Sequence, residues 1–416
     1  MDEHHTPLDL VREQSPERPV ALVRPSAVAV AARWFQDKLK GDVFYAVKAN
    51  PSRWVLETLW REGVRSFDVA SVSEIERVQA VAPEARLAFM HPVKSRAAIS
   101  RAYFDHGVRT FALDTHEELA KIIDATGQAR DLNLIVRMGV SAEGAAYSLS
   151  GKFGVHLDQA PDLLMATRRA TQDLMGVAFH VGSQCMRPSA FQAAMAQVSR
   201  ALVRSGVFAD VVDVGGGFPS IYPGMHPPDL QDYIDAVHRG FDEMMVHETT
   251  ELWAEPGRAL VAEASSILCK VELRKGDALY LNDGSYGGLF DATHARWPFP
   301  VKLIRDGEAS SELKPFRFYG PTCDSIDQAQ GPFWLPADIE EGDFVEIGML
   351  GAYGVAMSTR FNGFGEHDTV KVADAPMASM YGLAPRAIPL PRLQQEEDRK
   401  VVRFSRVKGG KRRRRK

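Results

Sequence analysis

The stretch Val43-Phe44-Tyr45-Ala46-Val47-Lys48-Ala49-Asn50 consists of β-branched, aromatic and small apolar residues with a single lysine near its end, and Pro51 follows. Such a run is typical of a strand that is buried on both faces and stopped by the proline. Lysine is rarely buried unless it is paired or used. An amine kept partly out of water loses its proton more easily and can form a Schiff base. A lysine that extends to solvent or pairs with a carboxylate is the structural alternative.

Short apolar strands, each followed by a helical pattern, recur around this stretch. We predict strands at Val43–Val47, Arg65–Val69, Arg86–Met90, Arg109–Leu113, Leu132–Met138, Val177–Val181, Val211–Val214 and Leu252–Ala254. Helices are predicted at Arg53–Glu62, Ser73–Val81, Ser95–His106, Thr115–Thr126, Ala160–Thr171, Ser189–Ser205 and Asp229–Val246. Strands that alternate with helices in this way favour parallel βαβ units. Eight such strands can close an α/β fold of the (β/α)8 TIM-type barrel class, and a doubly wound open sheet is the alternative.

The pattern changes after Gly257. Strands without long helices between them are predicted at Val261–Leu273, Ala278–Leu281, Phe316–Tyr319 and Phe344–Ile347, which indicates a C-terminal β domain. We therefore divide the chain into four parts. These are a loose lead with a strand at Val20–Val23 that packs with the β domain (1–25), the barrel (26–259), the β domain (260–393) and a basic disordered tail (394–416).

The composition, with 45% hydrophobic and 25% charged residues among 416, is typical of a globular protein in water. The three cysteines, Cys185, Cys269 and Cys323, are an odd number without metal-type spacing, which favours a reducing, cytoplasmic compartment and predicts no metal site. The segment Met1 to Arg18 lacks the apolar core of a signal peptide. No apolar run approaches the length of a transmembrane helix, so we expect no membrane partner.

Charge is distributed unevenly along the chain. The segment Arg399 to Lys416 holds 11 Lys and Arg residues and no acid; without these 11, the 50 basic residues fall to 39 against 54 acidic ones, a net charge of −15. The tail cannot bury itself and is predicted to be disordered. It is interpreted either as a solvated segment that rests on the acidic body or as a weak, salt-sensitive contact to a polyanion such as RNA or DNA.

Polar residues mark the predicted strand ends, where a barrel of this type has its active site. At or just after those ends lie Lys48, Asp68 with Ser71, His91, Asp114, Arg137, His180 with Ser183, Gly215-Gly216-Gly217, and Glu255 with Pro256-Gly257-Arg258. Packing requires none of them. Asp114 and His91 also fit helix caps or loop residues. Arg137 also fits an ion pair, and His180 a hydrogen-bonded core histidine.

The triple glycine is the more specific signal. Three residues without Cβ allow the backbone to approach a ligand closely, and its N–H groups can hold a phosphate. The stretch matches neither the dinucleotide fingerprint nor the P-loop. A compact phosphate beside an aldehyde-reactive lysine indicates pyridoxal phosphate. Glu255 would then hold the protonated ring nitrogen.

The chain resembles the fold-type III pyridoxal-phosphate decarboxylases of the ornithine and lysine decarboxylase group, which are related to alanine racemase. The resemblance covers about residues 25 to 365 and is carried by motifs in the expected order. They are Tyr45-Ala-Val-Lys-Ala-Asn50, Phe67-Asp-Val-Ala-Ser71, His180-Val-Gly-Ser183, Asp213-Val-Gly-Gly-Gly-Phe-Pro219, Glu255-Pro-Gly-Arg258, Gly320-Pro-Thr-Cys-Asp324, Ala352-Tyr353 and Phe361-Asn-Gly-Phe364.

This resemblance implies roles for individual residues. Lys48 would bind the cofactor aldehyde, Asp68 would lie near it, His180 would stack on the ring, and Glu255 would hold the ring nitrogen. The remaining cofactor-binding residues would be Arg137, Ser183, Gly215, Gly216, Gly217, Gly257, Arg258 and Tyr353. In the family, the active sites form only in a homodimer. Cys323, which would return a proton to Cα, and Asp324 would therefore come from the partner subunit.

The resemblance also bears on the substrate. The pattern Asp324-Ser325-Ile326-Asp327 is that of the ornithine and lysine branch, and Asp291 matches the acid that holds the distal amine, with Phe361 beside the substrate. Around Asp291 the local sequence, Phe290-Asp-Ala-Thr-His294, departs from the pattern of the animal enzymes. Two carboxylates pair with an ammonium group and repel a carboxylate. Decarboxylation of L-ornithine to putrescine is our first choice, and lysine, or both, is the alternative.

Two other classes remain open. Some relatives keep the fold but have lost the cofactor and act as regulatory binding proteins, although Lys48, Glu255, Cys323 and Asp324 are all present here. A racemase would place an arginine at the ring nitrogen, where this chain offers Glu255.

Overall fold

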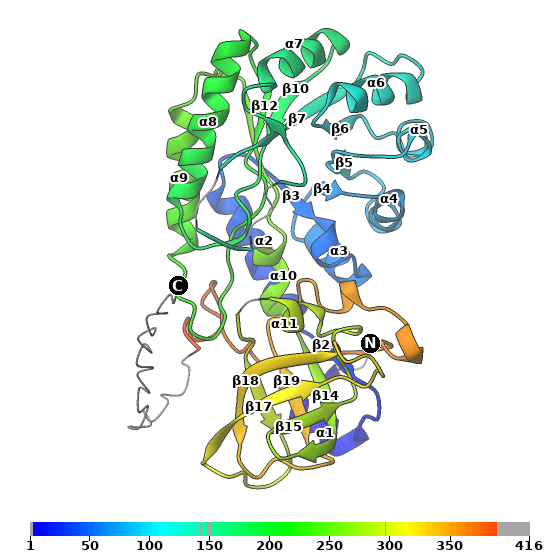
Figure 1. Cartoon of the computed structure of the whole chain (residues 1–416), viewed down its shortest axis with the longest axis vertical. Coiled ribbons are helices and arrows are strands. Elements are labelled where there is room, and N and C mark those ends of the chain that lie inside the picture. Colours follow the sequence, from blue (N-terminus) through cyan, green and yellow to red (C-terminus); the bar gives the residue numbers. More distant parts are fainter. Residues whose placement is uncertain (1–2, 142–143, 148–150, 296, 389–416) are drawn as a thin grey trace, which may run out of the picture.

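The computed structural model describes residues 3–141, 144–147, 151–295 and 297–388, so the predicted basic tail lies outside the described residues. The described chain forms a barrel and a β domain, which Figure 1 shows as the upper and lower halves of an elongated molecule. Among the described residues, no helix is both long and apolar enough to cross a membrane.

Eight parallel strands close the barrel in the order β3, β4, β5, β6, β7, β10, β12, β13 and back to β3. Their bounds are β3 (Asp42–Ala46), β4 (Ser66–Val69), β5 (Arg86–Phe89), β6 (Thr110–Leu113), β7 (Asn133–Gly139), β10 (Met175–Ala178), β12 (Val211–Asp213) and β13 (Glu251–Ala254). The predicted TIM-type barrel is confirmed, and the open-sheet alternative is wrong because β7 pairs with β10 and β13 pairs with β3.

Helices cover the outside of the barrel (Figure 1). They are α2 (Pro25–Lys38), α3 (Arg53–Arg61), α4 (Val72–Gln79), α5 (Arg96–Phe104), α6 (His116–Ala125), α7 (Ala160–Ala170), α8 (Ser189–Ser205) and α9 (Leu230–Asp242). The hydroxyls of Ser71, Ser95 and Thr115 accept backbone N–H groups in the first turns of α4, α5 and α6. Each hydroxyl satisfies a donor that has no partner within the helix. Thr115, and not Asp114, is therefore the cap of α6.

The barrel interior is packed with side chains from nearly every strand. One buried cluster consists of Phe44, Ala88, Met90, Ala112, Ile135, Ala178, Val211 and Trp253. A filled interior of this kind leaves the carboxyl ends of the strands as the place for a ligand. Two short strands, β8 (Ala145–Tyr147) and β11 (Ser183–Cys185), pair antiparallel beyond those ends, and β9 (Val155–His156) extends β7.

The β domain is one sheet with a branched order. Its main path runs β1–β20–β2–β14–β15–β17–β18, and β19 pairs with both β14 and β16. The bounds are β1 (Glu3–His4), β2 (Val20–Val23), β14 (Ser265–Lys275), β15 (Ala278–Leu281), β16 (Val301–Ile304), β17 (Leu313–Tyr319), β18 (Gln328–Pro336), β19 (Phe344–Ile347) and β20 (Asp368–Val372). The predicted β domain is thereby confirmed as a separate sheet.

The N-terminal lead is ordered and not loose. It contains β1 and the helix α1 (Pro7–Gln14), which begins with a capping box between Thr6 and Asp9. Strand β2 lies between β20 and β14, so residues from both ends of the chain share one sheet. Arg24, which is 3% exposed and follows β2 directly, donates to Glu346 on β19 and to Asp374 just after β20. It thereby links the end of β2 to both of these strands.

Two of the differences from the predicted strand bounds affect residues near the strand ends of the barrel. β10 (Met175–Ala178) begins two residues and ends three residues before the predicted strand Val177–Val181, so His180 follows the strand and is not part of it. The segment predicted to begin β14 at Val261 is instead helical, in α10 (Arg258–Val261) and the 3-10 turn η2 (Ala262–Ala264). In both places the apolar run extends beyond the strand that forms in the structure. An apolar run alone therefore does not specify the bounds of a strand.

Candidate active site

Lys48 lies just beyond the end of β3, in a single 3-10 turn, η1 (Val47–Ala49). Its ammonium group contacts Oδ2 of Asp68 on the neighbouring strand β4. The Asp68 side chain is 2% exposed, whereas that of Lys48 is 44% exposed. A ligand at the mouth of the barrel can therefore reach this amine.

The pKa of Lys48 corrects an expectation drawn from burial. Removal from water lowers the pKa of this amine, but the Asp68 and Glu255 carboxylates outweigh that effect and raise the pKa above its ordinary value. The expectation that burial makes Lys48 lose its proton more easily is therefore wrong in direction, because the neighbouring acids favour the protonated amine. An aldehyde can react only after the proton has left, and Asp68 is the base in contact with it.

The loop Gly215-Gly216-Gly217 follows β12 and has no room for side chains. Gly215 has a φ of +67°, and a Cβ there would lie 2.2 Å from the carbonyl oxygen of Phe179. At Gly217, with a φ of +107°, a Cβ would lie 2.5 Å from the carbonyl oxygen of Gly182. At Gly216 it would lie 2.8 Å from the carbonyl oxygen of Glu255. The backbone of this loop therefore packs directly against the segments that carry His180 and Glu255.

Asp213 and Glu255 form a buried pair of carboxyl groups next to this loop. The two side chains share a hydrogen bond, and Asp213 Oδ1 also accepts from the Gly215 N–H at 2.8 Å. Burial raises the pKa of Asp213 to about 6, and burial together with Asp213 raises the pKa of Glu255 well above its ordinary value. Glu255 Oε1 has no hydrogen-bond partner among the described residues. A buried carboxyl oxygen without a partner indicates a ligand group that would meet it.

His180 follows β10 and is held as a neutral imidazole. Its Nδ1 accepts from the Gly182 N–H at 2.9 Å. Burial, and then the charges of Arg137 and Lys48, lower its pKa to about 3. The ring can therefore lie against a ligand without adding a charge. Arg137 lies on β7 and Ser183 at the start of β11, and both side chains are half-buried.

Arg258 and Asp291 are paired with each other in this structure. Arg258 Nη1 donates to Asp291 Oδ2 at 2.6 Å and to the Tyr222 hydroxyl at 2.6 Å. The buried Nε of Arg258 has no hydrogen-bond partner among the residues that the structure describes. The residues expected at the phosphate and at the distal amine thus contact each other, and Arg258 has one donor without a partner among the described residues, which suits an anion.

The β domain is attached to the lysine turn by two hydrogen bonds. The N–H of Tyr353, a residue with a φ of +56°, donates to the Ala49 carbonyl at 2.9 Å. Asn50 Nδ2 donates to the Gly351 carbonyl at 2.8 Å. On the barrel side, Gly257 packs so closely that a Cβ would lie 3.1 Å from that of Ala49. Tyr353 and Gly257 therefore both lie against the turn that presents Lys48.

Cys323, Asp324 and Phe361 form a second group, on the surface of the β domain. Cys323 is exposed, and its N–H donates to Asn362 Oδ1 at 3.2 Å. Phe361 is 45% exposed. Within the described ranges, no hydrogen bond or ion pair connects Cys323 or Asp324 to Lys48, Asp68 or Glu255. The predicted site residues of one chain thus form two groups. We call the residues around Lys48, Asp68 and Glu255 the barrel group; Cys323, Asp324 and Phe361 form the other.

Several residues of the site were missed by sequence reasoning. Asp213, which precedes the glycine loop directly, was quoted in a motif but given no role, although its place at a strand end could have revealed it. Asn50 had a similar signal in its position before Pro51. Tyr222 and Tyr286 had no signal, because each hydroxyl acts on a residue more than 30 positions away.

The barrel group fits pyridoxal 5'-phosphate. Lys48 can bind its aldehyde, the unpaired Glu255 Oε1 can meet the ring nitrogen, and the glycine loop offers a backbone surface without side chains. The free Nε of Arg258 suits the phosphate. The features that a phosphate-bearing aldehyde requires are therefore gathered at one end of the barrel.

Comparison with known proteins points the same way. Residues 26–262 match the family model described as pyridoxal-dependent decarboxylase, pyridoxal binding domain. The lysine/ornithine decarboxylase of Selenomonas ruminantium is 32% identical over 345 residues, which are 81% of this chain and 85% of that protein. Antizyme inhibitor 2 of Xenopus laevis is 32% identical over 347 residues, 77% of this chain and 73% of that protein.

A similar solved structure is the arginine decarboxylase of Paramecium bursaria Chlorella virus bound to agmatine. It superposes with a TM-score of 0.78 at 27% identity and covers 88% of this chain and 98% of its own. Relatives of similar identity thus differ in the name of the substrate, while the fold is shared.

Proposed function

Since the chain belongs to the pyridoxal-dependent decarboxylases, whose cofactor is pyridoxal 5'-phosphate, we propose that it decarboxylates L-ornithine to putrescine and carbon dioxide. This reaction would place it in polyamine biosynthesis, and we propose a cytoplasmic location. The observation that carries the proposal is the buried Glu255 carboxyl with its free Oε1. An acid at the ring nitrogen favours an electron-accepting ring, which decarboxylation needs.

The residues of the barrel group bind and orient the cofactor. When bound, the cofactor supplies a ring that takes up the electron pair left at Cα when carbon dioxide departs. Lys48 holds its aldehyde, and Asp68 orients that lysine and accepts its proton. Glu255, with Asp213 beside it, would meet the ring nitrogen and keep it protonated, and the neutral His180 would lie against the ring.

The phosphate is assigned to the donors that remain. Arg258 contributes its free Nε, and Gly215 to Gly217 contribute backbone. Ser183, Arg137, Gly257 and Tyr353 complete the set, either in contact with the phosphate or against the lysine turn. Because Asp291 pairs with Arg258 at 2.6 Å, it lies beside the phosphate site, where the tail of a bound amino acid can reach it.

A second copy of the chain completes the site in this proposal. No hydrogen bond or ion pair among the described residues joins Cys323 or Asp324 to Lys48, Asp68 or Glu255, and Ile326 and Phe364 beside them in sequence are 60% and 42% exposed. We infer that these apolar side chains belong to an interface, since contiguous exposed apolar patches mark interaction sites. From a partner subunit, Cys323 can return a proton to Cα, and Asp324 can bind the distal ammonium of the substrate.

The experiment that tests the proposal compares substrates directly. Carbon dioxide release should be measured from ornithine, lysine, arginine and diaminopimelate with the purified enzyme and pyridoxal phosphate. We expect ornithine to be preferred, lysine to be the second substrate, and diaminopimelate to be inactive because its distal carboxylate faces acids. A preference for arginine or diaminopimelate would contradict the proposal.

The relative named antizyme inhibitor 2 gives a reason to test the cofactor as well. A regulatory homologue would bind no pyridoxal phosphate. We expect the purified protein to show a visible absorption band that borohydride shifts, because the reduced lysine adduct absorbs at shorter wavelength. Absence of that band together with absence of turnover would favour the regulatory class.

A further inference from the structure

Hydrogen bonds from within the β domain hold both oxygens of the Asp324 carboxylate. The Tyr286 hydroxyl donates to Oδ2 at 2.5 Å, and the Ile326 N–H donates to Oδ1 at 3.2 Å. The bond from Tyr286 is the main reason that the pKa of Asp324 lies below its ordinary value. A carboxylate has about four lone-pair positions, so two remain for an incoming ammonium group.

Tyr286 is itself fixed by the segment that carries Phe361. Its ring lies on that of Phe361 with 4.8 Å between centroids. Its carbonyl oxygen accepts from the Thr359 N–H at 2.7 Å and from the Thr359 hydroxyl at 3.1 Å. The hydroxyl that meets Asp324 therefore projects from a backbone and a ring that are both held in place.

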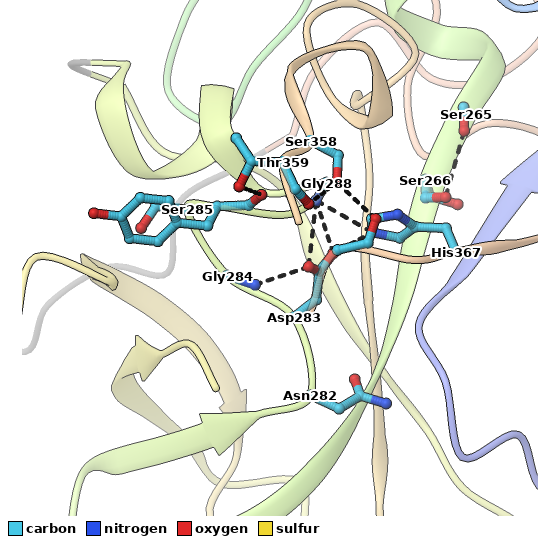
Figure 2. Close-up of polar contacts among 12 residues, drawn as sticks. Ser265, Ser266, Asn282, Asp283, Gly284, Ser285, Gly288, Ser358, Thr359 and His367 are labelled. Atoms are coloured by element: carbon cyan, nitrogen blue, oxygen red, sulfur yellow. Dashed lines mark hydrogen bonds and ion pairs between the residues drawn. The ribbon is translucent and has the colours of Figure 1, made fainter. Parts of the chain in front are cut away.

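A buried aspartate–histidine contact holds the loop from which Tyr286 projects. Figure 2 shows Asp283 and His367 facing each other, and Asp283 Oδ2 lies 2.8 Å from His367 Nε2 with both side chains 2% exposed. The Gly288 N–H donates to Asp283 Oδ2 at 3.0 Å, and the Gly284 N–H to Oδ1 at 2.9 Å. Asp283 therefore ties the loop 283–288 to His367. The two backbone groups that it accepts from, Gly284 and Gly288, lie near the two ends of that loop.

We propose that Tyr286 is a positioning residue that presents the Asp324 carboxylate to the distal ammonium group of the substrate and so sets the preferred chain length. An exposed aspartate without these bonds samples several rotamers and can meet amines at several distances. A carboxylate held in one place favours one distance, which is what discrimination between substrates that differ by one methylene requires. This inference rests on the proposed function.

Tyr286→Phe tests the inference because it keeps the ring on Phe361 and removes only the hydroxyl. We expect the KM for ornithine to rise about tenfold and kcat to change less than about twofold, since a hydrogen bond to a charged group is lost while the reacting atoms stay in place. Putrescine affinity, measured by calorimetry on the holoenzyme, should fall by about the same factor. The preference for ornithine over lysine should shrink.

Two controls isolate the hydroxyl. Norvaline, which has no distal amine, should be decarboxylated at the same low rate by the parent and by Tyr286→Phe. Tyr103→Phe removes a comparable bond, from the Tyr103 hydroxyl to Asp131 at 2.7 Å on the exposed end of α5, and should change none of these quantities.

The outcomes separate this inference from the function on which it rests. If the parent prefers ornithine and Tyr286→Phe has the same KM, putrescine affinity and substrate preference, Tyr286 does not position Asp324 and the inference alone is overturned. If the parent releases carbon dioxide from none of the diamino acids, the proposed function fails and the inference fails with it.

Discussion

Lys48 is the residue on which the proposed chemistry depends most directly. Lys48→Ala should abolish decarboxylation and the absorption band of the lysine-bound cofactor, because no other described amine touches Asp68. Activity and the visible spectrum measure this. The circular dichroism spectrum should stay that of the parent, and Lys302→Ala, an exposed lysine on β16, is the control. A Lys48→Ala enzyme with parental turnover would remove Lys48 from the site.

The Asp213–Glu255 pair makes a prediction about pH. Burial raises the pKa of Asp213 from 3.8 to about 6, so the folded protein holds this proton more tightly than the unfolded chain does. The resulting stability is complete below pH 3.8 and is lost as the pH rises to about 6. Asp213→Asn cannot ionise but still accepts from the Gly215 N–H. Unfolding of the cofactor-free protein should therefore show a smaller loss of stability over this pH range in the variant.

That comparison needs only the difference between the variant and the parent. Every other titrating group is common to both except Glu255, whose pKa is raised by Asp213, so its loss of stability with pH shrinks in the same direction in the variant. The prediction fails if the two proteins lose stability in parallel. A parallel loss would mean that the two carboxyl groups do not share a proton in the absence of the cofactor.

At the scale of elements, the glycine loop after β12 can be compared with a glycine that has the same backbone conformation. Gly215 and Gly206 have φ of +67° and +66°, but a Cβ at Gly206, after α8, would have nothing within 4 Å, whereas one at Gly215 would lie 2.2 Å from Phe179. Gly206→Ala should cost about 1–2 kcal/mol for the left-handed conformation alone. Gly215→Ala should lower the melting temperature further and weaken pyridoxal phosphate binding, measured by fluorescence titration.

The same comparison separates the cost of the left-handed backbone, which both glycines share, from the cost of a clash with Phe179, which only Gly215 has. Equal losses of stability in the two variants, with cofactor affinity unchanged in Gly215→Ala, would show that the loop can move away from Phe179. The close approach to the backbone would then not matter for the site.

The elements also show where sequence reasoning succeeds and where it stops. The barrel strands were found because each is a short run of apolar residues in a regular alternation with helices. β16 and β18 were missed because exposed and buried positions mix along them, as in the edge strands of a small sheet. α1 was missed because its buried residues, Pro7 and Leu10, are too few to give a periodic signal.

At the scale of the molecule, the proposed dimer predicts complementation. Lys48→Ala and Cys323→Ala should each be nearly inactive alone. After subunit exchange, mixed dimers should contain one intact site, up to about a quarter of all sites in an equal mixture. Carbon dioxide release from the mixture measures this, and mixing each variant with itself is the control. Mass spectrometry should verify that the subunits have exchanged. If activity does not recover in the exchanged mixture, a shared site is ruled out.

The candidate site could be predicted from the sequence only in its members and not in its pairings. The motifs named Arg258 and Asp291 for different ligands, yet Arg258 Nη1 donates to Asp291 Oδ2 at 2.6 Å. The charge state of Lys48 was predicted wrongly because burial was weighed without the neighbouring acids. Such couplings depend on distances between strands that are remote in the sequence, and a pattern of residue types does not contain them.

The position of β2 between β14 and β20 has a consequence for the nascent chain. Val20–Val23 leaves the ribosome long before both of its partners, because β14 begins at Ser265 and β20 ends at Val372. At about 5–20 residues per second, the strand waits roughly 10 to 50 seconds for β14 alone. During translation the barrel can close while the apolar strand β2 is still unpaired. Synthesis of β14 and β20, and not closure of the barrel, is therefore the step that removes this aggregation-prone strand from solvent.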